Sequence, residues 1–207
     1  RTALATDLQL FDGYPMKYIS YVRRIHRWIR GDWQIARYIL YSRIALISRW
    51  KIIDNLRRSL EAPSQLLLLF LAFTLFNDIY GFLVGLVLLS LCVPLFLNIV
   101  NNIINRTITL RILKYEMKVG FAQIFFTLAV LPHLAVVQVD AILRSIGRQI
   151  ITRRKLLEWE TSADSEINTK CTLKNFYLYM SPNIIVILIF FLGFYYVDIF
   201  IGAILSI

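Results

Sequence analysis

The feature that most constrains this chain is a run of apolar residues from position 79 to 100 that contains no charged side chain. A helix that crosses the hydrocarbon core of a bilayer needs about 20 mostly apolar residues, and this run is long enough to supply them. The chain of 207 residues is 58% hydrophobic, above the roughly 45–50% of an ordinary soluble domain. The sequence therefore predicts a mainly α-helical, polytopic membrane protein.

We predict four membrane spans from the apolar runs. The first has to begin near Glu61 to reach spanning length, and Pro63 suits its first turn because a missing N–H costs nothing there. Pro94 predicts a kink in the second span. The third run is the least apolar, and a re-entrant or interfacial helix stays open for it. The predicted spans are 61–77, 79–101, 119–139 and 183–205, and the residues that interrupt the third are Gln123, Pro132, His133 and Gln138.

The positive charge of the chain is concentrated in its first 60 residues. The net charge is +10, and residues 1–60 carry twelve Lys and Arg against four Asp, a balance of +8. Basic residues next to membrane spans favour the cytosolic side, where anionic lipids attract them. Nucleic acid also attracts basic segments, but beside a bilayer we expect lipid and no nucleic acid. The sequence thus predicts a cytosolic segment 1–60 and a transmembrane region 61–207.

The same charge rule conflicts with a third span at 119–139. The basic loop 102–118 belongs on the cytosolic side, as two preceding spans require. A third crossing would then place the basic residues between 144 and 155 on the outer side, against the rule. Either the third run is re-entrant or interfacial, or nearby acidic residues balance the loop and packing decides the topology. The sequence leaves both solutions open.

Residues 18–41 predict a basic amphipathic helix ahead of the spans. Apolar residues recur every three or four positions from Ile19 to Ile29, and arginines occupy the other faces. One interpretation is an interface anchor, with arginine stems snorkelling along the bilayer surface and tryptophan rings at headgroup level. The other interpretation, in which the helix carries a binding site, depends on a motif within it.

The order of residues from 24 to 34 supports the second interpretation. Arg24-Ile25-His26-Arg27-Trp28, followed by Gly31 and Gln34, resembles the (Q/R)xxRW signature of membrane-embedded inverting glycosyltransferases such as cellulose, chitin and hyaluronan synthases. Over a longer stretch, the sequence is similar to the cyclic β-1,2-glucan synthase family. The blocks that carry this similarity are 7–15, 26–34, 48–59 and 140–159, and together they extend over most of residues 1–166.

This resemblance implies a role for the motif helix. In such enzymes it lies under a cytosolic α/β transferase domain of the GT-A-like type, so residues 1–60 would be the C-terminal remnant of that domain, with a strand ending at Thr6-Asp7. Arg27 would face the diphosphate, because a forked guanidinium suits an oxyanion. Trp28 would support the acceptor sugar, because an indole covers the apolar face of a pyranose. The implied catalytic residues are Arg27 and Trp28, and the implied substrate-binding residues are Arg24, Arg27, Trp28 and Gln34.

The resemblance also implies partners beyond this sequence. The substrates would be UDP-glucose and a growing β-1,2-glucan, with Mg²⁺ or Mn²⁺ on the UDP. The metal-binding carboxylates and the general base are expected upstream of Arg1, so this piece alone is expected to be inactive, and a phosphorylase-like domain is expected after Ile207. His26 is not expected to be the base, because these transferases use a carboxylate. The implied location is the inner (cytoplasmic) membrane of a bacterium.

Two other classes of function stay open. A non-catalytic membrane scaffold would keep the amphipathic helix but would not need Arg27 and Trp28 as a pair. A transporter subunit would need ionisable residues inside its spans. The candidates for that role are Asp78, His133, Asp140 and Asp198.

Overall fold

The described part of the chain is helical. In the computed structural model of this chain, the described residues are 15–41, 44–107, 109–152 and 172–205, and no β-strand occurs among them. The mainly α-helical fold class predicted from the sequence is therefore confirmed. The predicted strand end at Thr6-Asp7 and the last part of the similarity block 140–159, from 153 onward, lie outside the described residues.

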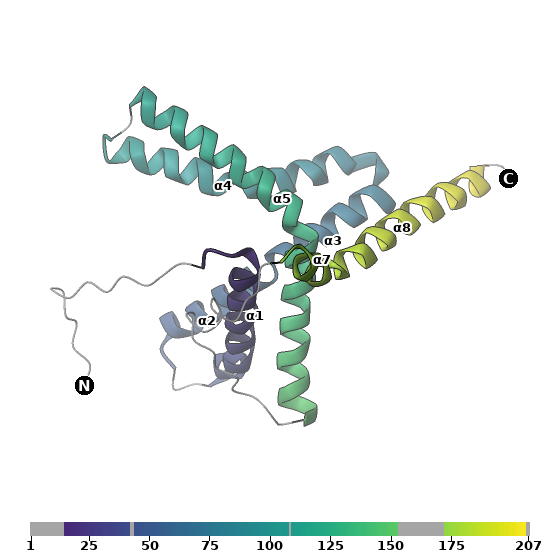
Figure 1. The fold of residues 1–207 in the computed structure, drawn as a ribbon, viewed down its shortest axis with the longest axis horizontal. Coiled ribbons are helices and arrows are strands. Elements are labelled where there is room, and N and C mark those ends of the chain that lie inside the picture. Colours follow the sequence, from purple (N-terminus) through teal and green to yellow (C-terminus); the bar gives the residue numbers. More distant parts are fainter. Residues whose placement is uncertain (1–14, 42–43, 108, 153–171, 206–207) are drawn as a thin grey trace.

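The helices follow the division of the sequence into a basic and an apolar part (Figure 1). The basic part forms α1 (Tyr18–Ile35), the 3-10 turn η1 (Ala36–Leu40) and α2 (Leu46–Ser59). The apolar part begins with α3 (Glu61–Thr74), the 3-10 turn η2 (Asn77–Ile79) and α4 (Tyr80–Ile104). It continues with α5 (Leu110–Gly147), a π-helical turn η3 (Arg148–Thr152), α7 (Leu173–Met180) and α8 (Pro182–Leu205).

α1 lies beside the second half of α5, and both helices run in the same direction. Among the described residues, four polar contacts connect α1 to α5 and to η3, which continues α5. Each contact joins residues 114 to 116 positions apart in the chain, and this constant separation means that the helices are parallel. Between these contacts Ile29 packs on Ala141 and Ile142 in a small buried cluster. The contacts are Tyr18 Oη with His133 Nδ1 (2.8 Å), His26 Nε2 with Asp140 Oδ2 (3.0 Å), Ser145 Oγ with the Arg30 carbonyl (3.0 Å) and Gln149 Nε2 with the Trp33 carbonyl (3.1 Å).

α2 covers another side of α1, so that α1 lies between α2 and α5 (Figure 1). The Trp33 indole N–H donates a hydrogen bond to Ser59 Oγ at 2.9 Å. Asn55 Nδ2 donates to Asp32 Oδ1, also at 2.9 Å. These contacts fix the basic helix in a layer of three helices, in contrast to a helix that only floats on a bilayer surface.

α3 and α4 form an antiparallel hairpin. Gln65, near the start of α3, donates a hydrogen bond to Ser90 Oγ at 2.9 Å. Phe73, near the end of α3, packs on Tyr80 at the start of α4, with ring centroids 6.4 Å apart. α4 therefore leads the chain back toward the level at which α3 begins.

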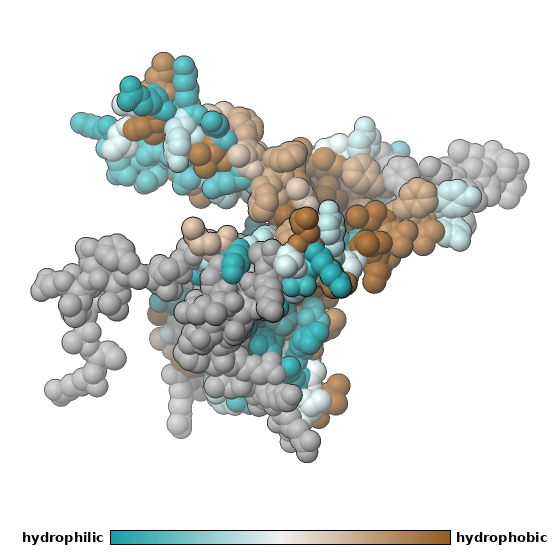
Figure 2. Space-filling model, in the orientation of Figure 1, coloured by the Kyte–Doolittle hydropathy of each residue, from teal (hydrophilic) through white to brown (hydrophobic). Residues whose placement is uncertain are grey.

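α8 runs along α3 in the same direction. The rings of Phe70 and Phe190 are 5.1 Å apart, and a Cβ added at Gly193 would lie 2.8 Å from the Phe70 ring. A larger residue at position 193 would therefore force the Phe70 ring to move. Many large apolar side chains of the apolar helices face outward, including Phe82 of α4 (66% exposed) and Phe191 of α8 (67% exposed), and Figure 2 shows apolar surface along the first part of α8. Such continuous apolar surface is typical of helices that face lipid.

α5 has 38 residues and would be about 57 Å long if straight, but Figure 1 shows that it changes direction along its course. Thr109 caps its start by accepting a hydrogen bond from the Ile112 N–H. Pro132 inside the helix lacks an N–H and clashes with the preceding turn, which produces a kink. The first half packs on α4, where a Cβ at Gly120 would lie 2.5 Å from Leu95. The kink lets one helix join the apolar hairpin to the layer around α1.

The helix lengths can be compared with the predicted spans. By length and composition, α4 and the continuous helix Leu110–Thr152 can cross a bilayer. α7 and the first part of α8 also qualify when they are counted as one span bent by 43°. α3 has 14 residues, fewer than the roughly 20 that a straight span needs. α4 and α8 thus match the predicted spans 79–101 and 183–205 in their bounds, while α5 extends far beyond 119–139.

Candidate functional site

The sequence of α1 produces a helix with two buried basic residues. Ile19, Val22 and Ile29 are at most 5% exposed and form its apolar face. Arg24 and Arg30 are each only 9% exposed. A helix that served only as an interface anchor would keep its arginine heads in water. Arg24 and Arg30 are therefore part of the packed layer.

A pocket of about 440 Å³ opens between α1, α2 and α5. Its apolar wall comes from isoleucine side chains of α1, and Trp28 lies at its surface with 61% exposure. All three helices contribute polar groups, so the pocket exists only when they are assembled. The polar lining residues are Arg27 and Asp32 from α1, Asn55, Arg58 and Ser59 from α2, and Gln138 from α5.

The structure brings two of the four predicted binding residues to this pocket. Arg27 and Trp28 both line it. Arg24 packs against Trp28, with its Cζ atom 4.8 Å from the centroid of the ring, a cation–π contact that typically contributes about 0.5–1 kcal/mol. Gln34 is not among the lining residues in the described part of the chain. The binding roles of all four residues stay predictions.

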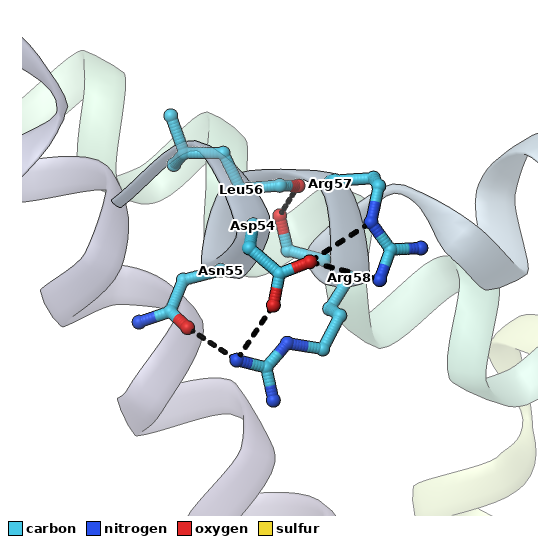
Figure 3. Close-up of polar contacts among 6 residues, drawn as sticks. Asp54, Asn55, Leu56, Arg57 and Arg58 are labelled. Atoms are coloured by element: carbon cyan, nitrogen blue, oxygen red, sulfur yellow. Dashed lines mark hydrogen bonds and ion pairs between the residues drawn. The ribbon is translucent and has the colours of Figure 1, made fainter. Parts of the chain in front are cut away.

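A network within α2 places Arg58 at the pocket (Figure 3). Arg58 Nη2 donates to Asn55 Oδ1 at 2.7 Å and pairs with Asp54 Oδ2 at 3.1 Å. Arg57 pairs with the same carboxylate at 3.0 Å. Arg58 lies in block 48–59 but had no predicted role, because only the tertiary structure brings it to the same pocket as Arg27.

Asp32 connects the pocket wall to α2. Its carboxylate accepts the hydrogen bond from Asn55 described above. Burial raises the pKa of Asp32 above its ordinary value, and the hydrogen bond from Asn55 opposes this shift. The lining therefore holds one half-buried carboxyl group beside two guanidinium groups, which leaves the pocket with an excess of positive charge.

His26 belongs to the interface between α1 and α5. Its Nε2 lies 3.0 Å from Asp140 Oδ2, and Arg144 Nε lies 2.7 Å from the same carboxylate oxygen. Burial lowers the pKa of His26, while the hydrogen bond to Asp140 raises it in part. The contact holds the two helices in register, and His26 does not line the described pocket.

The ionisable residues that a transporter would place along its pathway pack between helices or lie in a turn. His133 is 1% exposed and contacts the Tyr18 hydroxyl at 2.8 Å. Asp140 pairs with side chains of α1 and of its own helix. Asp78 is exposed in η2, and the side chain of Asp198 lies outside the described part of the chain. For His133 and Asp140, these contacts favour a packing role over a transport role.

The pocket has the chemistry of a site for an anion and a sugar. Arg27 and Arg58 carry permanent positive charges on forked groups that match phosphate oxygens. The exposed indole of Trp28 offers a flat surface for a pyranose ring. Among the described residues, no group of three or more His, Cys, Asp or Glu side chains could hold a metal ion. The Mg²⁺ or Mn²⁺ site expected upstream of Arg1 stays a prediction.

We expect Gly31→Ala to stabilise α1. Glycine inside a helix costs about 1 kcal/mol relative to alanine, and a Cβ at Gly31 would meet no atom within 4 Å. In the full-length protein, hydrogen–deuterium exchange of the α1 amides should therefore slow about fivefold. Gly81→Ala, in α4 and equally free of contacts, should leave α1 unchanged. Faster exchange in Gly31→Ala would mean that another part of the protein packs directly on position 31.

Fold and site together define a helical membrane protein that has a cationic, aromatic pocket beside its apolar helices. No family model matches the chain. The chain is similar to cyclic beta-(1,2)-glucan synthase NdvB of Rhizobium meliloti (strain 1021), with 33% identity over 172 residues. The matched region is 79% of this chain and 6% of that protein. The resemblance predicted from the motif blocks is therefore confirmed, for a small region of a much longer relative.

Proposed function

We propose that the parent of this chain is a processive, inverting glycosyltransferase that transfers glucose from UDP-glucose to a growing β-1,2-glucan at a membrane. The observation that carries this proposal is that Arg27 and Trp28, the two motif residues with predicted catalytic roles, line one pocket with a further cation, Arg58. The similarity to a protein named as a cyclic glucan synthase supports glucan as the product.

Arg27 would act on the departing UDP. Negative charge grows on the diphosphate as the bond from the anomeric carbon to UDP breaks. A guanidinium that is already in place stabilises this charge, and one well-placed donor contributes about 3 kcal/mol in such sites. Arg58 would add a second positive charge from the opposite wall. A divalent metal held elsewhere in the parent would supply further positive charge to the diphosphate.

Trp28 would hold the acceptor. The 2-hydroxyl of the terminal glucose attacks the anomeric carbon from the face opposite UDP, so the configuration inverts. A new bond from carbon to the glucan oxygen forms, the bond to UDP breaks, and the hydroxyl proton passes to a carboxylate expected upstream of Arg1. An indole under the pyranose would restrict the acceptor to orientations from which this attack succeeds.

The direct test uses membranes that contain the full-length parent and radiolabelled UDP-glucose. We expect label to enter a polymer whose linkage analysis gives β-1,2 bonds. Polymer formed only from another sugar nucleotide would overturn the proposed donor. Membranes with correctly inserted protein that form no polymer from any sugar nucleotide would overturn the proposed function.

The proposed setting is the inner membrane of a bacterium, with residues 1–60 in the cytosol, where sugar nucleotides are made. The proposal includes a transferase domain before this chain and a phosphorylase-like domain after it. The matched region is only 6% of the named relative, so a parent with further domains agrees with the comparison.

We also infer that α5 begins and ends on the side of the membrane where α1 lies. α4 returns antiparallel to α3, so Ile104 lies on the side where α3 begins. From there α5 reaches the start of α3, where Leu131 and Ala135 pack on Ala62. It then continues beside α1. This arrangement supports the re-entrant or interfacial alternative for the third apolar run.

In this topology the crossings are α3, α4 and α8, and α3, with 14 residues, crosses where the bilayer thins locally around a short helix. Phe176 of α7 packs on Tyr18 of α1, with centroids 6.1 Å apart, so α8 starts on the side of α1 and then runs along α3. Lys and Arg occur only at 1–58, 106–118 and 144–174, which this topology assigns to one side. The conflict with the charge rule disappears, because no basic cluster has to face outward.

The topology predicts which single cysteines a membrane-impermeant maleimide can reach. In a parent without Cys92, Cys171 or other native cysteines, Ile150→Cys on η3 and Lys51→Cys on α2 should react only from the cytosolic side. Asp78→Cys in η2 should react only from the outside. Each of these positions is exposed in the structure. Labelling of Ile150→Cys from outside in intact cells, with Lys51→Cys unlabelled, would mean that α5 crosses the membrane.

A further inference from the structure

Asn55 connects the motif helix α1 to the cation that α2 contributes to the pocket. Its Nδ2 donates a hydrogen bond to Asp32 Oδ1 of α1 at 2.9 Å. Its Oδ1 accepts a hydrogen bond from Arg58 Nη2 at 2.7 Å, as Figure 3 shows. All three side chains line the pocket that Arg27 also lines. A single amide thus bridges a carboxylate of one helix and a guanidinium of the other.

The two neighbours of Asn55 require both halves of its amide. A carboxylate accepts hydrogen bonds, whereas a guanidinium only donates them. An amide offers a donor and an acceptor at once, so it can serve both neighbours. Leucine has approximately the same shape and offers neither group, and it therefore removes the bridge without removing either of the charges that it connects.

Asp54 also pairs with Arg58, but it does not connect Arg58 to α1. Arg58 Nη2 lies 3.1 Å from Asp54 Oδ2, and Arg57 pairs with the other oxygen of the same carboxylate at 3.0 Å. Among the described residues, the partners of Asp54 all belong to α2. In the described part of the chain, the hydrogen-bonded link from Arg58 to the motif helix therefore passes through Asn55.

Arg58 is held by one nitrogen and keeps donors for a ligand. Its guanidinium contacts to described residues both use Nη2, so Nε and Nη1 can still donate. The side chain is 60% exposed, which makes it accessible from the pocket. A long side chain that is ordered only when the ligand binds weakens binding, because the interaction has to offset the lost freedom of the side chain. A hydrogen bond that holds Arg58 beforehand reduces this loss.

We propose that Asn55 is a positioning residue that holds Arg58 in the pocket, so that Arg58 and Arg27 together bind the diphosphate of UDP. This inference rests on the proposed function. Electrostatics also connect the three bridged groups. Burial raises the pKa of Asp32, and the hydrogen bond from Asn55 and the charge of Arg58 oppose this rise.

The experiment measures the Kd of UDP, in the presence of Mg²⁺, for the full-length protein in lipid nanodiscs. Arg58→Leu removes the cation and should raise the Kd about tenfold or more, the loss expected for a hydrogen bond to a charged group. Asn55→Leu leaves the cation but no longer holds it, and should raise the Kd about fivefold.

The double variant decides whether Asn55 acts through Arg58. If it does, Asn55→Leu combined with Arg58→Leu should match the Kd of Arg58→Leu within about twofold, because no guanidinium is left to position. If the two losses instead multiply, Asn55 acts independently of Arg58 and the inference is wrong. A purely structural role would give this second result.

Trp33→Phe is the matched control for loss of contact between α1 and α2. It removes the indole N–H that donates to Ser59 Oγ at 2.9 Å, and Trp33 does not line the described pocket. Its Kd for UDP should equal that of the wild type. If Trp33→Phe weakens UDP binding as much as Asn55→Leu does, the affinity depends on helix packing alone and the inference fails. Asn55→Ala removes the same bridge and repeats the test if Asn55→Leu does not insert into the membrane.

The outcomes separate failure of this inference from failure of the proposed function. If the wild type binds UDP, Arg58→Leu weakens binding and Asn55→Leu does not, only the role of Asn55 is wrong. If Arg58→Leu binds UDP like the wild type, Arg58 does not contact the diphosphate and the inference is wrong, while the proposed role of Arg27 stays. If the wild-type protein neither binds UDP nor makes polymer from any sugar nucleotide, the proposed function is wrong and this inference fails with it.

Discussion

Arg27→Ala and Trp28→Ala in the full-length parent should each reduce glucan synthesis from UDP-glucose severely, while the protein still inserts into the membrane. For Arg27 we expect the rate of glucan synthesis to fall about 100-fold to 1,000-fold. The negative charge that grows on the departing diphosphate in the transition state would no longer be stabilised by a hydrogen-bond donor fixed in position. For Trp28 we expect a higher Km for the acceptor as well as a lower rate, because the acceptor loses its supporting surface. The measurement is incorporation of radiolabel at several UDP-glucose and acceptor concentrations.

The chain offers matched controls for both substitutions. Trp50 on α2 is 64% exposed, close to the 61% of Trp28, but it does not line the pocket. If tryptophans near the apolar helices act only as interface anchors, Trp50→Ala and Trp28→Ala will have similar effects. Arg37→Ala, at an exposed position in η1, is the control for loss of one positive charge. If Arg27→Ala and Trp28→Ala both make glucan at the normal rate, the proposed catalytic role of the motif helix is wrong.

Ala141→Phe should separate α1 from α5 and inactivate the enzyme without changing any lining residue of the pocket. Ala141 is 0% exposed and packs with Ile29 and Ile142. Extra volume in a packed core costs about 1–3 kcal/mol, so hydrogen exchange of the α1 amides should become about 5-fold to 150-fold faster. Because α1 carries Arg27 and Trp28, a shift of this helix by about 1 Å should reduce glucan synthesis about 100-fold.

Leu143→Phe is the control for this substitution. Leu143 is two residues away on α5 and 64% exposed, so a larger ring there meets lipid or water and leaves α1 in place. Equal exchange rates and equal synthesis in the two variants would contradict the α1–α5 interface. If Ala141→Phe loses glucan synthesis while hydrogen exchange of the α1 amides stays unchanged, the new ring affects the site without displacing α1.

The motif helix α1 shows which structural features the sequence could predict and which it could not. The spacing of apolar residues predicted α1 as an amphipathic helix, because periodicity depends only on the local sequence. The same pattern predicted that Arg23, Arg27 and Arg30 would lie on the other faces, but Arg30 is buried, as is Arg24. Their burial depends on the tertiary contacts of α1, which local periodicity cannot show. The sequence predicted no place in the pocket for Arg58 and Gln138 for the same reason. Each of them lines the pocket from a helix other than α1.

By itself, the sequence determined that this protein is helical, has apolar helices long enough for a membrane, is basic at its start, and resembles a glucan synthase. Each of these properties follows from residue type, order and spacing along the chain. Only the tertiary structure decided that α1 and the second half of α5 run in parallel and that Arg27 and Trp28 share a pocket with residues of α2 and α5. The physical reason is that these features depend on packing between helices that are distant in the sequence. For α1 and α5, about 115 positions apart, Ala141 and Ser145 make the close approach possible.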